Sequence, residues 1–166
     1  MKLRLLLWEE CPKRCPLCAN RHYDLKALPV VDGYAGYEEI VLTGGEPMLW
    51  PDRVKETVAE IRQQTDAPVY MYTAWTRDVF EVLSVLKRLD GLTVSIHNYG
   101  DVLNFALVNI AVEKLWFLLS DKSLRLKIFE GSRMHPERFN LSRWQVERVK
   151  WLEHCPLPEN EVFMRL

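Results

Sequence analysis

The chain has 166 residues, the size of one ordinary domain, and 48% of them are hydrophobic, enough for one core. Its 22 Lys and Arg residues nearly balance 23 Asp and Glu residues, so it lacks the basic excess that general nucleic-acid binding requires. The apolar run at the N-terminus is too short for a signal peptide, and no stretch approaches the roughly 20 apolar residues of a membrane span. We therefore expect a cytoplasmic protein without membrane segments.

Short β-rich runs alternate with helical patterns along the chain. We expect strands at residues 3–8, 39–42, 69–73, 92–96 and 124–129. Apolar spacing predicts helices at residues 51–64, 76–89, 101–119 and 141–154, although residues 115–119 alone also fit a strand. Strands separated by helices imply an α/β fold with a parallel sheet and right-handed crossovers. Because a full eight-unit barrel needs about 250 residues, we expect an open partial (β/α) barrel of about five to six mainly parallel strands. Residues 1–166 would form this single domain.

Three cysteines follow the first predicted strand within eight residues. Cys11, Cys15 and Cys18 are spaced by three residues and then by two, on a segment whose prolines indicate a loop. Thiolates are soft ligands that suit an iron–sulfur cluster or zinc. Structural zinc usually needs a fourth protein ligand, which Cys155 or His154 could supply. The spacing favours the cluster over zinc, and Cys155 is otherwise read as a structural thiol.

A second motif, Gly44-Gly45-Glu46-Pro47, follows the second predicted strand. The two glycines allow a sharp turn and a close backbone approach to a ligand. Glu46 would then project a carboxylate at the strand end, where it suits a ligand ammonium group. Taken alone, a Gly-Gly pair is more simply a plain turn.

Two weaker candidates end the fourth predicted strand. Ser95 and His97 share one face of that strand by alternation, and they serve either a ligand or local turn chemistry. Further on, Trp144 and Trp151 lie at helical spacing in the last predicted helix, where we expect them to be core residues.

Together, the two strong motifs resemble the radical S-adenosylmethionine (radical SAM) superfamily. That superfamily carries Cys-x3-Cys-x2-Cys after its first strand and Gly-Gly-Glu-Pro after its second. The resemblance implies that the three loop cysteines bind a 4Fe–4S cluster, that the open iron binds S-adenosylmethionine, and that Gly44 to Pro47 contact its amino group. It also implies that the polar residues Ser95 and His97 reach the ribose. Leu17 stands where an aromatic residue is usual, and it would pack on the adenine.

By this resemblance the protein is a radical SAM enzyme. One electron, from a reductant such as flavodoxin or ferredoxin, would split S-adenosylmethionine into methionine and a 5′-deoxyadenosyl radical. The radical would remove hydrogen from an unidentified substrate. An open barrel leaves room for a macromolecular substrate or for a protein partner that completes the site.

Three alternatives stay open. Residues 15–20 and 72–75 resemble activases of glycyl radical enzymes such as the anaerobic ribonucleotide reductase, although the glycine-rich segment before their cysteines is missing here. A tailoring enzyme for nucleosides or deazapurine precursors is the second alternative. The third is a non-catalytic module that binds iron–sulfur or zinc.

Overall fold

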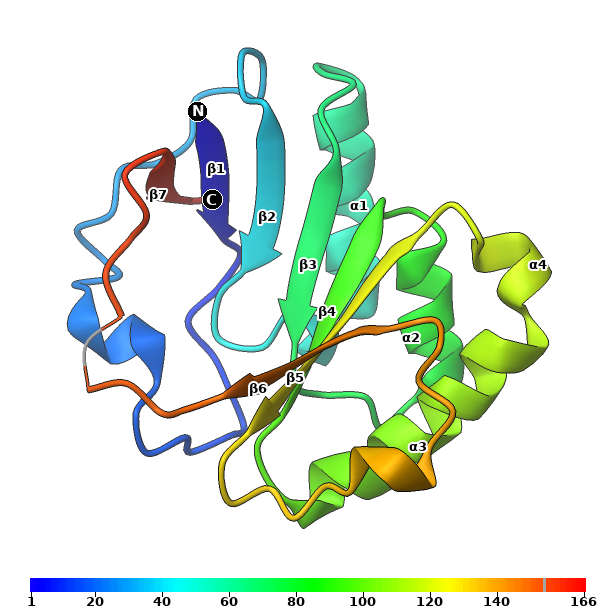
Figure 1. The fold of residues 1–166 in the computed structure, drawn as a ribbon. Coiled ribbons are helices and arrows are strands. Elements are labelled where there is room, and N and C mark those ends of the chain that lie inside the picture. Colours follow the sequence, from blue (N-terminus) through cyan, green and yellow to red (C-terminus); the bar gives the residue numbers. More distant parts are fainter. Residues whose placement is uncertain (154) are drawn as a thin grey trace.

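The computed structural model describes residues 1–153 and 155–166, and within them the chain forms one open sheet of seven parallel strands (Figure 1). The strands are β1 (Lys2–Leu6), β2 (Glu39–Thr43), β3 (Val69–Thr73), β4 (Gly91–Ile96), β5 (Ser123–Phe129), β6 (Gln145–Val149) and β7 (Glu161–Arg165). The α-helices are α1 (Pro51–Arg62), α2 (Val79–Leu86), α3 (Tyr99–Lys114) and the short α4 (Trp116–Leu119). Short 3-10 helices span Ala19–His22, Pro47–Leu49 and Pro136–Arg138. Among the described residues, none of these helices is long and apolar enough to cross a membrane.

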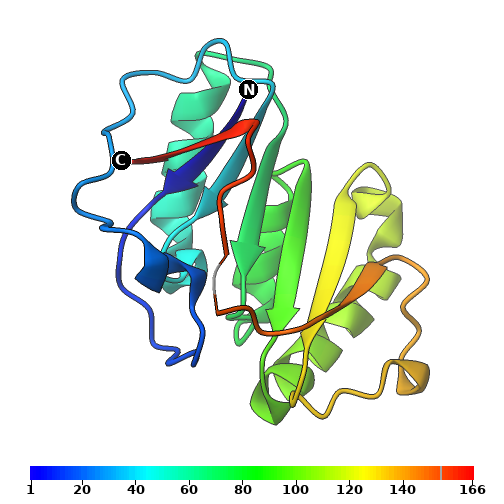
Figure 2. The ribbon, with the colours of Figure 1, turned by 60° about the vertical axis from the view of Figure 1, so that its left-hand side comes forward.

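The strands lie in the order β6-β5-β4-β3-β2-β1-β7. Strands β1 to β6 therefore lie side by side in the order in which they occur in the sequence. Strand β7 lies on the outer side of β1, where Leu3 pairs with Val162. Strand β7 is parallel to its neighbour, so residues 150–160 connect the carboxyl end of β6 to the amino end of β7. The described residues of this connection, 150–153 and 155–160, lie over the face of the sheet opposite the α-helices (Figure 2).

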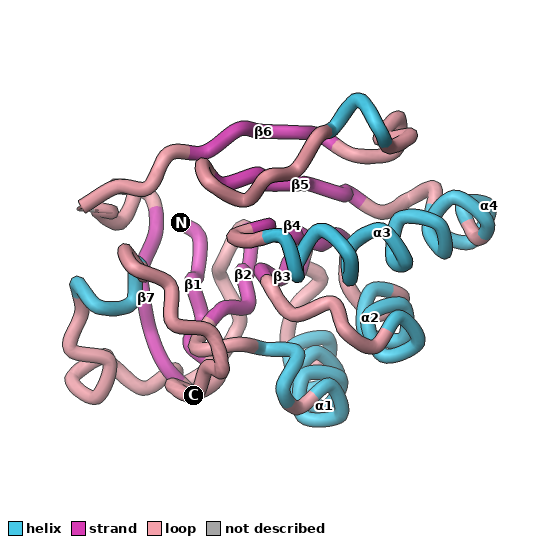
Figure 3. The backbone as a smooth tube through the Cα atoms, turned by 90° about the horizontal axis from the view of Figure 1, so that it is seen from below, coloured by secondary structure: helices cyan, strands magenta, loops and turns pink. Residues whose placement is uncertain are grey.

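The helices cover one face of the curved sheet, and the core lies between them and the strands (Figure 3). Alternation in β3 shows the division, because Val69 and Met71 are buried in the core whereas Tyr70 and Tyr72 are half-buried on the other face. Parallel sheets usually have helices on both faces. Because no α-helix covers the other face of this sheet, that face is open to a ligand.

The predicted α/β class, the parallel sheet and the five predicted strands are confirmed. Residues 101–119 are helical as predicted, but they belong to two helices, α3 and α4, which are separated at Leu115. The predicted helix over residues 141–154 is wrong, because Gln145–Val149 forms the edge strand β6. The strand number is also corrected from five or six to seven, all of them parallel. Four of the five residues of β6 are exposed, and two of them, Glu147 and Arg148, are charged, as is common for an edge strand. The strand therefore lacks the alternation of buried and exposed residues that would have revealed it.

The two tryptophans expected on one helix face are separated in space. Trp144 is buried against Phe105 in the core, with ring centroids 5.0 Å apart. Trp151 lies instead beside Phe129 at the end of β5, with ring centroids 4.4 Å apart. The helical spacing was a coincidence of sequence, since the backbone between the two rings is extended.

Candidate functional site

A cavity of about 410 Å³ lies at the carboxyl ends of the strands, on the face without helices. Small-molecule sites typically have volumes of about 300–1,000 Å³. Every site residue predicted from the sequence lines this cavity: Cys11, Cys15, Leu17, Cys18, Gly44, Gly45, Glu46, Pro47, Ser95 and His97. The fold thus brings both motifs and the end of β4 together around one space.

The cysteine loop, residues 11–18, comes after β1 in the chain and lines one side of the cavity. Cys11 is exposed, Cys15 and Cys18 are half-buried, and all three thiols are free. Burial raises the pKa of Cys11, and it raises the pKa of Cys15 to about 11, with the neighbouring Cys18 and Cys11 adding to that second shift. Within the described residues, no three His, Cys, Asp or Glu side chains are grouped so that they could hold a metal ion.

The Gly-Gly turn is joined directly to the base of the cysteine loop. The Gly45 N–H donates to the Trp8 carbonyl at 2.7 Å, and the Glu46 N–H donates to the Glu10 carbonyl at 2.9 Å. A Cβ on Gly45 would lie 1.9 Å from the Glu10 carbonyl oxygen, and Gly44 has a φ of 142°. The glycines are therefore required because two backbone segments touch here, one from each motif.

A second contact joins the turn to the far end of the cysteine loop. The Asn20 side-chain amide donates to the Gly44 carbonyl at 2.7 Å, and the Trp8 indole donates to the Glu46 carbonyl at 2.9 Å. The turn is thus hydrogen-bonded to residues on both sides of the three cysteines. A shift of the turn would carry the cysteine loop with it.

Glu46 differs from the carboxylate expected at a strand end. It is 2% exposed, and its oxygens accept hydrogen bonds from the Met48 N–H at 3.0 Å, the Ala74 N–H at 2.9 Å and the Thr73 hydroxyl. Burial raises its pKa, and these hydrogen bonds oppose that shift. A carboxylate offers about four acceptor positions. Glu46 therefore mainly ties β2 to the end of β3, with little capacity left for a ligand.

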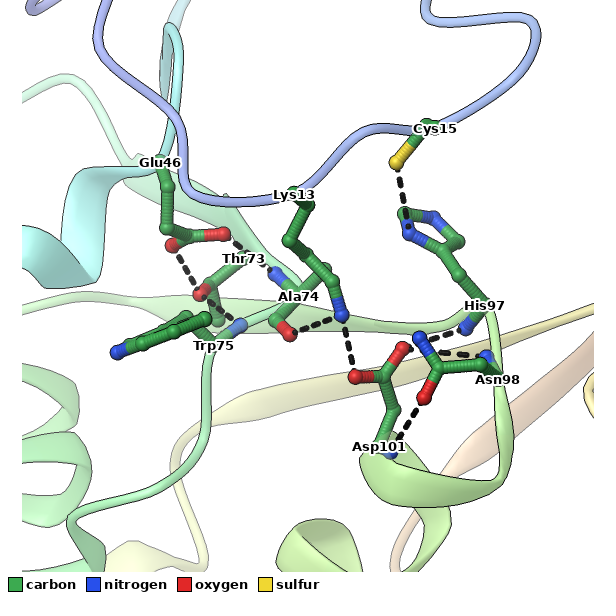
Figure 4. Close-up of polar contacts among 9 residues, drawn as sticks. All are labelled: Lys13, Cys15, Glu46, Thr73, Ala74, Trp75, His97, Asn98 and Asp101. Carbon is green, nitrogen blue, oxygen red and sulfur yellow. Dashed lines mark hydrogen bonds and ion pairs between the residues drawn. The ribbon is translucent and has the colours of Figure 1, made fainter.

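Lys13, within the cysteine loop, was not predicted as a site residue. Its ammonium donates to the Ala74 carbonyl at 3.0 Å and forms an ion pair with Asp101 in the first turn of α3 (Figure 4). Both side chains are 9% exposed. The sequence signal that was available is the Asn98-x-x-Asp101 pattern of a helix capping box, which the structure contains. It marks the start of a helix, and it does not reveal the lysine partner.

His97 lies against the cysteine loop, a contact that was not predicted from the sequence. Its Nδ1 atom is 3.3 Å from the Cys15 sulfur. Its ring meets Phe129 edge to face at a centroid distance of 4.6 Å and lies tilted against Trp151 at 5.1 Å. Burial, and then the nearby Lys13 cation, lower the pKa of His97 to about 4. The ring is therefore neutral at pH 7. Ser95 lies two residues earlier, and both residues line the cavity, as strand alternation predicted.

The connection from β6 to β7 forms the remaining wall of the cavity. Trp151, Leu152 and Cys155 line it, and the Cys155 carbonyl accepts a hydrogen bond from the Tyr23 hydroxyl at 3.0 Å. Sequence reasoning missed this wall, because it placed residues 141–154 in a helix. Cys155 consequently faces the same cavity as the three loop cysteines, whereas His154, the other residue considered as a zinc ligand, lies outside the described residues.

Comparison of the chain with models of known protein families and with curated proteins finds no match.

Proposed function

We propose that this chain is a radical SAM enzyme that holds a 4Fe–4S cluster on Cys11, Cys15 and Cys18. The observation that carries the proposal is the direct hydrogen bonding of the Gly44–Glu46 turn to residues 8–10, at the base of the cysteine loop. These hydrogen bonds fix the two motifs relative to each other. They do so at the carboxyl ends of the strands, where parallel α/β sheets bind their ligands. A plain turn or an isolated metal loop needs no such junction.

The donor set fits an iron–sulfur cluster. Three free thiols lie on one short loop beside a cavity, and soft thiolates are the usual ligands of such clusters. Three cysteines also leave one iron of a cubane for a small ligand. The chemistry supplied when both groups are bound is one-electron cleavage of S-adenosylmethionine to methionine and a 5′-deoxyadenosyl radical, with flavodoxin or ferredoxin as the electron donor.

The chain's own residues bind and orient the ligand in this proposal. The backbone of Gly44 to Pro47, which lines the cavity, would bind the amino group, and Glu46 holds that backbone in place through its hydrogen bond from the Ala74 N–H. Leu17 supplies an apolar contact for the adenine, and Ser95 and His97 supply polar groups for the ribose. Trp151 and Leu152 also line the cavity, where they would limit the access of water to the bound ligand.

The curved, open sheet fits the partial barrel of this class of enzyme. Its cavity is about 410 Å³ in volume, and in the described residues none of the α-helices α1 to α4 covers the face of the sheet beside it. A substrate larger than the cavity would therefore extend out of it, and a protein partner could cover the remaining opening.

The proposal is tested by anaerobic reconstitution with iron and sulfide, followed by electron paramagnetic resonance of the dithionite-reduced protein. We expect about four irons per chain and a spectrum that changes when S-adenosylmethionine is added. The Cys18→Ser variant should lose the cluster, whereas the matched Cys155→Ser variant should keep it. A metal site that needs Cys155, or a spectrum that S-adenosylmethionine leaves unchanged, would instead indicate a non-catalytic zinc or iron–sulfur module.

A further inference from the structure

A buried lysine lies in the middle of the cysteine loop, where loops are usually solvated. The Lys13 side chain is 9% exposed, and its ammonium contacts the Ala74 carbonyl after β3 and the Asp101 carboxylate (Figure 4). Removing a cation from water is costly unless it is paired and hydrogen-bonded. The burial of Lys13 therefore depends on Asp101 and Ala74, which together receive its ammonium.

Asp101 is itself held in place by the turn between β4 and α3. Its second oxygen accepts hydrogen bonds from the His97 N–H at 2.9 Å and the Asn98 N–H at 3.2 Å. The Asn98 side chain in turn accepts from the Asp101 N–H at 3.1 Å, which completes the capping box. The position of the Asp101 carboxylate is thus set by its own turn, independently of the cysteine loop.

The same turn contacts the cysteine loop at two points. Asp101 binds Lys13, and the His97 ring lies 3.3 Å from the Cys15 sulfur. Lys13 and Cys15 are two residues apart, so together they hold the central part of the loop against the end of the sheet. The Gly-Gly turn holds the base of the loop at residues 8–10 independently.

We propose that Lys13 and Asp101 are a positioning pair, which orders the cysteine loop against the end of the sheet, beside the cavity, before any cluster is present. This role rests on the proposed function for its purpose, whereas the ordering itself is a property of the metal-free chain. The pair also places one cation and one anion beside the cysteines. Removing either charge alone therefore changes the electrostatic potential at the cluster, in opposite directions for the two residues.

The first test uses the metal-free protein under reducing conditions and limited trypsin digestion, with mass spectrometry to follow cleavage after the exposed Arg14. We expect Lys13→Met to increase the rate of this cleavage about tenfold or more, because an untethered loop enters the protease more readily. Lys13→Arg should restore most of the protection. The matched control Lys2→Met, which breaks the ion pair of Lys2 with Glu39 at the opposite end of β1, should leave the Arg14 rate unchanged.

A double variant, Lys13→Met with Asp101→Asn, guards against a simple folding defect. It removes the unpaired buried charge, and asparagine can still accept the capping hydrogen bonds. We expect this variant to unfold near the wild-type temperature and still to be cleaved rapidly after Arg14. An Arg14 cleavage rate equal to wild type in a folded Lys13→Met or double variant would overturn the proposal.

The second test is a dithionite titration of the reconstituted protein, in which dithionite supplies the electron that the cluster accepts. Lys13→Met should lower the midpoint potential and Asp101→Asn should raise it, because one change removes a cation and the other an anion. A purely structural role would not give shifts of opposite sign, and equal shifts would overturn the electrostatic part. A chain that binds no cluster but shows the expected trypsin results would retain the positioning pair and lose the proposed function.

Discussion

The contact between Gly45 and the base of the cysteine loop gives the sharpest prediction of stability. In Gly45→Ala the new Cβ would lie 1.9 Å from the Glu10 carbonyl oxygen and 2.3 Å from its carbon. Both neighbours are backbone atoms, so the two segments must move apart. Separation would break the bonds from Gly45 to Trp8 and from Glu46 to Glu10. Each bond contributes about 1 kcal/mol and overpacking costs about 1–3 kcal/mol, so we expect a loss of about 3–5 kcal/mol.

The assay is urea-induced unfolding of the metal-free protein, followed by the fluorescence of its six tryptophans. Gly33→Ala is the matched control, because its nearest neighbour is the Gln64 side-chain oxygen at 3.4 Å, an ordinary contact. We expect this control to remain within about 0.5 kcal/mol of wild type. If Gly45→Ala unfolds at the same urea concentration as Gly33→Ala, the junction of the two motifs does not have the structure described above.

Two further substitutions test hydrogen bonds that support the site and strand β6. Glu46→Gln should lower the free energy of unfolding by about 1–3 kcal/mol, because the new amide would place a donor against the Ala74 N–H. Thermal unfolding would show this loss when the variant is compared with the exposed control Glu60→Gln. Equal melting temperatures of the two variants would contradict the prediction. Asn109→Leu should cost about 1–3 kcal/mol, because the buried Asn109 accepts from the Trp144 indole at 2.8 Å and donates to the Asn140 carbonyl at 3.1 Å. Hydrogen exchange should then accelerate in β6, and unchanged protection there would refute this link.

The Glu46 result also affects how binding experiments are designed. From sequence alone, Glu46→Ala looks like a clean test of ligand binding, because the residue follows a strand end. In the structure the carboxylate supports the ends of β2 and β3. Loss of S-adenosylmethionine binding in that variant would therefore report disturbed structure as well as a lost contact.

The sequence was most informative where local pattern and tertiary environment agree. Buried strands such as β4 read as apolar runs, and the two motifs follow β1 and β2, so their meeting at one sheet edge could be predicted from parallel topology. The strand alternation of Ser95 and His97 was likewise enough to place both on the cavity side.

The missed features depend on partners that are distant in the chain. Strand β6 pairs with the edge of β5, and its charged residues reveal neither that pairing nor a buried face. Strand β7 joins β1 across about 160 residues. The pair of Lys13 and Asp101 spans 88 residues, and a lysine in a cysteine loop reads as a solvated charge until the fold brings its acceptor to it.

The central claim is tested most directly by the production of 5′-deoxyadenosine. The reconstituted protein is reduced under anaerobic conditions, given S-adenosylmethionine, and assayed by chromatography beside Cys15→Ala and Cys155→Ser. The account predicts 5′-deoxyadenosine from the wild type and from Cys155→Ser, and none above background from Cys15→Ala. A fully assembled cluster that yields no 5′-deoxyadenosine, or a yield that survives Cys15→Ala, would contradict it.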